Sequence, residues 1–203
     1  MKKYTVFIGI AVLLLGGVVF YRYHGRDVDE RGATLLMRSL ENRDDLTKTR
    51  RFIKRADDIN ARDKAGRTAL FYAARYAADA ASIQHLLEAG AEPNLSDKQG
   101  HTALMKAAEE NPSPAVAEAL LRGGADVNMT DGAGETALTR AARNNKAAVV
   151  KVLLRGGADP DVKTTDGKTA AELLAENENF SDQEKTDYRQ AMLVLSILKP
   201  VGK

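Results

Sequence analysis

The chain of 203 residues has no cysteine and no tryptophan, and aromatic residues make up only 5% of it. The absence of cysteine excludes a disulfide framework, a thiolate zinc site, a cysteine nucleophile and a lipid-modified cysteine. It does not indicate a compartment, because a cysteine-free chain is compatible with oxidising and with reducing surroundings. With so few aromatic residues, the core must consist mainly of alanine, leucine and valine.

An excess of charge is also lacking once the first residues are set aside. The formal net charge is +2, but residues 1–26 hold four basic residues and no acidic one, so the remainder carries a net charge of −2. A nearly neutral remainder gives no electrostatic argument for binding nucleic acid. We therefore expect no nucleic-acid partner.

The first residues form a region of different composition. Residues 6–20 carry no polar side chain, two lysines precede them, and tyrosines stand at both ends of the run. With these flanks, residues 4–23 are long enough to cross a bilayer as one helix, which needs roughly 17–25 residues. We interpret residues 1–26 as a signal-anchor region with a single transmembrane helix, and residues 27–203 as a second domain.

A cleaved secretory signal is the alternative for the same residues, because it also has a basic start and an apolar middle. Such a signal ends in a small-x-small site, whereas this run ends in Val18-Val19-Phe20-Tyr21. The positive charges on the two sides of the run are nearly balanced. The short tail with two lysines favours an N-terminus in the cytoplasm, which places residues 27–203 outside the cytoplasm, in the periplasm of a bacterial-type cell.

The rest of the chain is an internal repeat. A glycine followed by a short apolar stretch recurs five times, at intervals of 34, 34, 34 and 33 residues. A second motif runs in phase with it and reads GAEPN, GADVN and GADPD in three of its copies. The glycines that begin the five units are Gly32, Gly66, Gly100, Gly134 and Gly167.

Each unit predicts two short helices. A threonine two residues after each of the last four unit glycines can cap the first helix by accepting a bond from a free N–H. Alanine pairs keep that first helix slim, and a leucine pair ends the second helix. The glycine that follows the leucines can then adopt the left-handed conformation that stops a helix. These positions are Thr68, Thr102, Thr136 and Thr169 for the caps and Gly90, Gly124 and Gly157 for the stops.

These motifs resemble the ankyrin repeat, whose pattern is close to D-x-x-G-x-T-P-L-H-x-A-A, a second helix ending in L-L, and G-A-D-V-N. Residues 131–142 read DGAGETALTRAA and residues 124–128 read GADVN, and the resemblance covers about residues 29–199. It implies an all-α solenoid of about five helix–turn–helix units with extended loops, preceded here by the transmembrane helix.

The sequence departs from that pattern at two positions of each unit. Alanine replaces the family proline, and Phe71, Met105 and Thr139 replace the histidine that ties neighbouring loops together in the family. We therefore expect a somewhat looser stack. The first and last units look like caps, and Ser181 with Glu184 predicts a capping box at the start of a final helix that covers the end of the stack.

No catalytic constellation is evident. The only three histidines, His24, His85 and His101, are scattered, and almost every residue from 29 to 199 has a place in the repeat. No inserted loop is left to build a pocket, and the glycines follow the repeat rather than a phosphate-binding pattern. We expect no enzyme activity, no cofactor and no metal site. A small-ligand-binding or enzymatic protein is the alternative from another class.

Binding to another protein is the function that the resemblance implies. In this architecture the loop tips and the exposed side of each first helix line a concave surface. Tyrosine and arginine are enriched in binding hot spots, so an aromatic and basic cluster in the second unit is the best anchor. The predicted partner-binding residues are Lys64, Arg67, Tyr72, Arg75, Tyr76, Lys98, His101, Glu109, Glu110 and Arg143.

The combined interpretation is a membrane-tethered scaffold that holds a protein partner near a membrane. It is similar to small exported ankyrin proteins of bacteria. One possible role is an accessory factor of a periplasmic enzyme that handles oxidative stress, and the alternative is an immunity-type inhibitor of a toxic effector. The sequence indicates neither the partner nor the oligomeric state.

Overall fold

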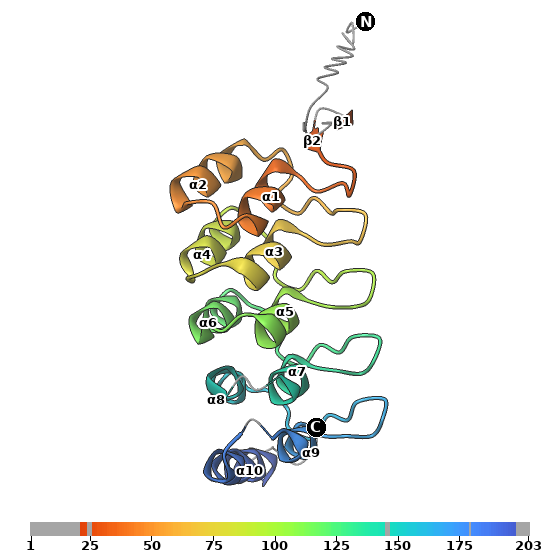
Figure 1. The fold of residues 1–203 in the computed structure, drawn as a ribbon, viewed down its shortest axis with the longest axis vertical. Coiled ribbons are helices and arrows are strands. Elements are labelled where there is room, and N and C mark those ends of the chain that lie inside the picture. The colour runs from red at the N-terminus through yellow and green to blue at the C-terminus, as the bar shows by residue number, and fades with distance from the viewer. Residues whose placement is uncertain (1–20, 24–25, 145–146, 179, 198–203) are drawn as a thin grey trace, which may run out of the picture.

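Five pairs of helices are stacked in a single row in the computed structural model, which describes residues 21–23, 26–144, 147–178 and 180–197 (Figure 1). The first helices of the units are α1 (Leu35–Glu41), α3 (Ala69–Tyr76), α5 (Ala103–Glu110), α7 (Ala137–Arg143) and α9 (Ala170–Glu176). The second helices are α2 (Leu46–Arg55), α4 (Ala81–Glu88), α6 (Pro114–Arg122), α8 (Ala147–Arg155) and α10 (Asp182–Ile197). The predicted all-α solenoid of five units is confirmed.

The first helices form one column and the second helices form another, while the loops between units project together to one side (Figure 1). Helix α3 packs against α1 and α5, and α7 packs against α5 and α9. The predicted alanine pairs allow this close approach, since Ala73, Ala74, Ala107 and Ala108 are no more than 1% exposed. The core between the two columns is aliphatic, as the lack of aromatic residues required.

A short antiparallel hairpin precedes the first unit. Strand β1 (Tyr21–Tyr23) pairs with strand β2 (Arg26–Val28), and Tyr21 is opposite Val28. The end of the predicted transmembrane helix is therefore wrong, because its last three residues lie in a strand whose backbone bonds are made to β2. The rest of the predicted span lies outside the described residues. Within the part of the chain that the structure describes, no helix is both long and apolar enough to cross a membrane.

The predicted threonine caps are confirmed. Each of the four threonines accepts a hydrogen bond from the backbone N–H three residues later, as Thr68 does from Phe71 at 3.3 Å. Thr34 does the same in the first unit. The predicted helix stops Gly90, Gly124 and Gly157 all have positive φ. Every unit therefore starts and stops its helices by the same local chemistry.

Consecutive loops are joined by backbone hydrogen bonds, although the family histidine is missing. One N–H of each loop donates to a carbonyl of the loop before it, at 2.8–3.1 Å, and the four bonds are Lys64 N to Arg31 O, Lys98 N to Ala65 O, Gly132 N to Gln99 O, and Thr165 N to Ala133 O. Gly66 permits this approach, because a Cβ there would lie 3.1 Å from the backbone nitrogen of Lys98.

Asparagine side chains join the units on the other edge. Asn94 donates from Nδ2 to the carbonyl of Gly124 at 3.1 Å and accepts at Oδ1 from the N–H of Asp126 at 2.7 Å. Asn60 and Asn128 make the same pair of bonds to the units that follow them. The asparagine of the GADVN motif is therefore a cross-unit tie and not only a turn residue.

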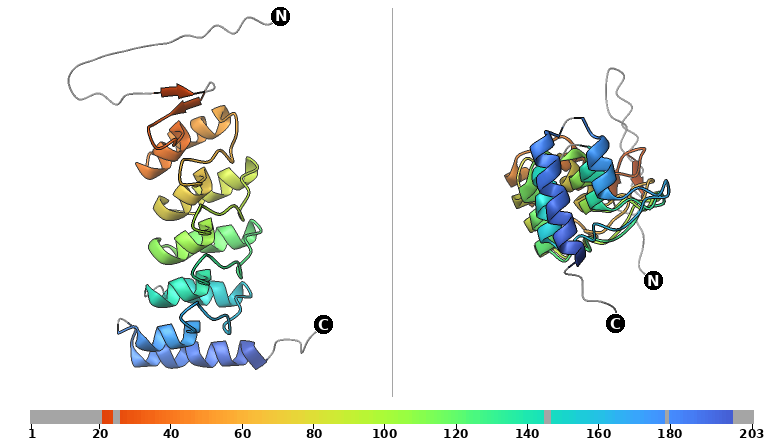
Figure 2. Two further views of the ribbon diagram at one scale, coloured as in Figure 1. Left: turned by 90° about the vertical axis from the view of Figure 1, so that its right-hand side faces the viewer. Right: turned by 90° about the horizontal axis from the view of Figure 1, so that it is seen from below.

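The last helix covers the C-terminal end of the stack, as predicted (Figure 2). Tyr188 and Met192 are each 3% exposed, and the Tyr188 hydroxyl donates to the carbonyl of Ala147 at 2.8 Å. The predicted capping box is present, since Ser181 N donates to Glu184 Oε2 at 3.0 Å and Glu184 N donates to Ser181 Oγ at 3.3 Å. The outermost predicted contacts of this helix, Leu195 and Leu198, fall outside the described side chains.

Candidate functional site

The loop that begins each unit is organised by a buried carboxylate. In the first four units an aspartate three residues before the unit glycine accepts two backbone N–H bonds at Oδ1, and Asp131 accepts them from Ala133 at 2.8 Å and Glu135 at 2.9 Å. The four aspartates are Asp29, Asp63, Asp97 and Asp131. Their second oxygen, Oδ2, is left for a side chain.

The side chain that reaches Oδ2 differs from unit to unit. In the second unit the Tyr72 hydroxyl donates to Asp63 Oδ2 at 2.8 Å. In the third unit His101 Nδ1 lies 3.2 Å from Asp97 Oδ2. In the fourth unit Arg140 donates from Nη2 to Asp131 Oδ2. The loop backbone is therefore constant, while the group that fastens it is variable.

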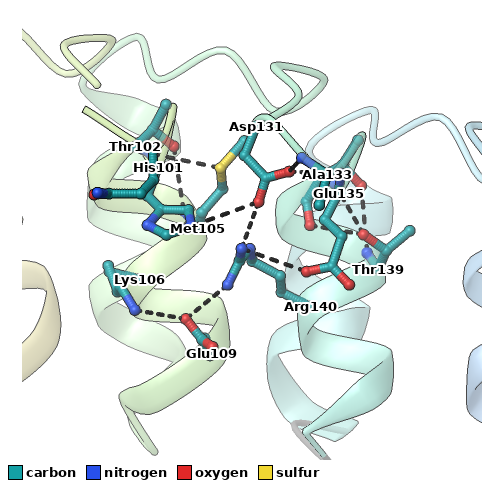
Figure 3. A network of polar contacts seen from close by, with 12 residues as sticks. His101, Thr102, Met105, Lys106, Glu109, Asp131, Ala133, Glu135, Thr139 and Arg140 are labelled. Atoms are coloured by element: carbon teal, nitrogen blue, oxygen red, sulfur yellow. Dashed lines mark hydrogen bonds and ion pairs between the residues drawn. The ribbon is translucent and has the colours of Figure 1, made fainter. Parts of the chain in front are cut away.

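Arg140 is the centre of the largest polar network (Figure 3). Its side chain is 9% exposed and also contacts Glu109 at 2.8 Å and Glu135 at 3.4 Å. Glu109 belongs to the preceding unit and accepts a second bond from Lys106 at 2.7 Å. The network therefore joins the third unit to the fourth through charged side chains.

The charges of this network shift the pKa values of its members. Burial by itself raises the pKa of Asp131, but the bonds from Arg140 and from two backbone N–H groups outweigh it and hold the pKa below 3.8. Burial likewise opposes ionisation of Glu109, and Lys106 and Arg140 lower its pKa overall. The pKa of Arg140 is raised, because three carboxylates outweigh the cost of its burial. All of these groups are charged at neutral pH.

Five of the predicted residues are drawn into ion pairs on this face. Glu109 contacts Lys106 and Arg140, and Glu110 contacts Arg75 and Lys106. The other two contacts are made by His101 and Arg143, with Asp97 and Asp131 as partners of His101 and Glu135 as the partner of Arg143.

The helix ends of the second and third units meet through one of these pairs. Arg75 is paired with Glu110 of the next unit, and its guanidinium also lies 4.9 Å from the ring centroid of Tyr76. About a third of the Arg75 side chain is exposed, 34%, and 29% of the Glu110 side chain. Tyr76 itself packs partly against the core. This part of the predicted surface is both accessible and held in place.

Tyr72 is a correction to the predicted surface. Its side chain is buried, with an exposure of 2%, because its ring enters the core and its hydroxyl fastens Asp63. It cannot contact a partner in this structure. It supports Tyr76 instead, whose ring lies nearly parallel to it with a centroid separation of 6.4 Å.

The remaining predicted residues lie on the loops. Lys64 and Lys98 are exposed at the loop tips, where their backbone nitrogens make the bonds between loops. Arg67 is half-buried, with its guanidinium 5.8 Å from the ring centroid of Phe71. These three cations are close in sequence to the buried aspartates but do not enter the Arg140 network.

Sequence reasoning missed the centre of the network. Arg140 and Lys106 stand four residues after the capping threonine, which is the position that Tyr72 occupies in its own unit. Tyr72 was singled out as an aromatic residue, and the equivalent cations were not. Comparing that one position across the units could have identified them.

Metal and catalytic chemistry were also examined on these residues. Among the residues that the structure describes, no group of three or more histidine, aspartate or glutamate side chains is placed to hold a metal ion. The carboxylates of the Arg140 network are committed to basic side chains and backbone N–H groups. The chemistry that this face offers is recognition by charge and hydrogen bonding.

Comparison with known protein families gives one match. Residues 76–164 match the model of ankyrin repeats, in three copies. No curated protein matches the chain. The matched range begins at the end of α3 and ends in the loop before α9, and the helix pairs described above continue on both sides of it.

Proposed function

Because this chain is an ankyrin-repeat protein, we propose that it is a non-catalytic scaffold that holds a protein partner on the face formed by its loops and first helices. We call this surface the loop-side face, and its predicted contacts are Lys64, Arg67, Arg75, Tyr76, Lys98, His101, Glu109, Glu110 and Arg143. The proposal extends to a tether at residues 4–23 that keeps the partner near a membrane.

The observation that carries the proposal is the ordering of this face before any partner binds. Long charged side chains normally lose rotamer freedom when they enter an interface, at roughly 0.5–1.5 kcal/mol each. Here Arg75, Glu109 and Glu110 are already held by ion pairs between neighbouring units while they remain partly exposed. Binding to such a surface would cost less entropy than binding to free side chains.

The charge pattern indicates the kind of partner. Cations of the second and third loops, Lys64 and Lys98, stand at the tips, and the acidic pair Glu109 and Glu110 lies on the helix below. Both signs are therefore present within two units. A complementary protein surface would carry acidic groups opposite the loops and basic groups opposite the helices.

A charge-swap variant tests the surface without removing its ion pairs. We expect Arg75→Glu with Glu110→Arg to reverse the charges at a junction between units while it keeps opposite charges together. Capture of the partner by crosslinking in native membranes should fall at least tenfold, because complementary charges would become like charges. Thermal unfolding should change little.

The matched control is Glu118→Arg with Arg122→Glu on α6. These two side chains form an exposed pair at 3.7 Å on a second helix, away from the loop-side face. Capture should be unaffected in this variant. Equal capture by the wild type and by the folded Arg75 and Glu110 variant would overturn the surface assignment.

The finer role that we propose is an accessory factor of an exported enzyme, with the repeats in the periplasm. A single cysteine at the exposed residue Thr130 would report the side of the membrane, because the chain has no other cysteine. Labelling of intact cells by an impermeant maleimide is expected. Protection until lysis would contradict the periplasmic location and leave the scaffold proposal standing.

A further inference from the structure

The two ends of the stack differ in charge, and the N-terminal end is basic. Helix α2 carries five lysine and arginine residues among its ten residues and no acidic residue. At the other end α10 has both signs, with three acidic and two basic residues in its sequence. Either composition would keep an end soluble, so solubility alone does not explain why one end has a single sign.

Repeat equivalence shows where three of these cations point. Lys48, Arg51 and Arg55 are placed 68 residues, or two units of 34, before Val116, Ala119 and Gly123. These later residues face the preceding unit: Val116 is fully buried, and a Cβ at Gly123 would lie 2.4 Å from a methyl group of Leu87. The first unit has no unit before it, so the three cations face the open end of the stack, and all three are exposed.

Few carboxylates neutralise this end. Lys48 pairs with Asp44 at 3.0 Å, and Arg50 on the same helix contacts His85 of the next unit. Within the described part of the chain, no carboxylate is paired with Arg51 or Arg55. The open end therefore presents cations that still lack a counter-charge.

The position of this end in the chain selects the counter-charge. The apolar run of residues 6–20 ends 15 residues before α1, and part of that distance is folded back in the hairpin of β1 and β2. At about 3.3–3.6 Å per residue, even a fully extended linker of this length reaches only about 50 Å. A run held in a bilayer would keep the first unit, and not the last, close to the lipid headgroups.

We propose that the N-terminal end of the stack binds an anionic phospholipid surface through Lys48, Arg51 and Arg55. The inference rests on the membrane attachment of the proposed function. A basic residue next to anionic lipid strengthens binding about fivefold, so three of them together give roughly 100-fold. Contact at this end would stand the row of units away from the bilayer and leave the loop-side face open.

The test uses the full chain in vesicles of phosphatidylcholine, with or without phosphatidylglycerol. A donor dye is placed on a single cysteine at Thr47, beside the basic end, or at Gln183 on α10, and both positions are exposed. The acceptor is a lipid labelled at its headgroup. We expect energy transfer from position 47 to increase when phosphatidylglycerol is present and to fall in about 0.5 M salt, which screens charges beyond a few ångströms. Transfer from position 183 should stay low.

Charge reversal provides the decisive variant. Lys48→Glu, Arg51→Glu and Arg55→Glu together should abolish the phosphatidylglycerol effect, and the corresponding glutamine changes should reduce it. The matched control reverses three exposed cations elsewhere, Arg122→Glu, Arg155→Glu and Lys163→Glu, and should keep the effect. Circular dichroism checks that each variant is folded.

The outcomes separate this inference from the proposed attachment. Flotation with phosphatidylcholine vesicles tests the attachment alone, and failure there contradicts the tether. Flotation without any effect of phosphatidylglycerol at position 47 overturns the lipid contact and leaves the tether intact. Tighter binding of duplex DNA than of anionic vesicles, lost in the same triple variant, would also overturn it in favour of a nucleic-acid surface.

Discussion

The second and fourth units fasten the same loop in two different ways. Tyr72 and Arg140 each stand four residues after a capping threonine, and each reaches the free oxygen of its loop aspartate. Tyr72 is a neutral donor that satisfies Asp63 inside its own unit. Arg140 is a cation that satisfies Asp131 and also binds Glu109 of the unit before it. One helix position can therefore stabilise a unit locally or couple it to its neighbour.

Replacing the cation should break this comparison with the largest effect. We expect Arg140→Leu to lower the free energy of unfolding by about 3–5 kcal/mol, because Asp131, 1% exposed at its side chain, would be left as an unpaired buried charge. Urea unfolding measures the change. The control Arg122→Leu, at a cation with a 63% exposed side chain, should change stability by less than about 0.5 kcal/mol. Equal effects of the two variants would contradict the central role of Arg140.

Acid should sharpen the same contrast. The folded-state pKa of Asp131 is lowered, so this group contributes stability above its unfolded value of 3.8, and the contribution is lost as the pH falls through the folded value. We expect Asp131→Asn to be less stable than the wild type at pH 7, with the difference shrinking as the pH falls below about 4. Unfolding curves over this range measure the difference. A difference that stays constant would show that protonation of Asp131 is not linked to folding.

The neutral fastener should give the smallest effect. Tyr72→Phe should cost about 1–2 kcal/mol by leaving one oxygen of Asp63 without its donor. Burial and the neighbouring Asp63 raise the pKa of Tyr72 to about 12, so its stabilisation is complete below the ordinary value of 10 and is lost as the pH rises toward 12.

Absorbance titration of the phenols measures this prediction. The wild type should contain a tyrosine that ionises about two pH units late, and the Tyr72→Phe variant should lack it. Tyr76→Phe is the matched control, since it changes the adjacent aromatic ring on the same helix. A late-ionising phenol that persists in the Tyr72→Phe variant would mean that another tyrosine is responsible.

The sequence predicts the elements of this fold well because each signal acts within one unit. A threonine that caps a helix three residues away and a glycine that stops one need no knowledge of the neighbours, and Thr68 and Gly124 behave as expected. The final helix was also predictable, since Ser181 and Glu184 form a local pair. Local rules repeated five times specify the stack.

The candidate surface is less predictable because its contacts join different units. The pairing of Arg75 with Glu110 depends on the spacing between stacked helices, and no motif inside one unit encodes it. Tyr72 was misplaced for the same reason, because its burial depends on packing against neighbouring helices rather than on its residue type. The loop bonds between Lys98 and Ala65 use backbone atoms, which leave no trace in residue identity.

The single hydrogen bonds between consecutive loops have a mechanical consequence. Each loop holds only the next one, as Gly132 holds Gln99 and Thr165 holds Ala133, and no described backbone bond joins loops that are two units apart. A force that pulls the two ends apart acts on these junctions in series, while a force across the row is shared by several units. The molecule should therefore lengthen by peeling one unit at a time from a loaded end, and a partner that bridges two loops would act as a splint against such peeling.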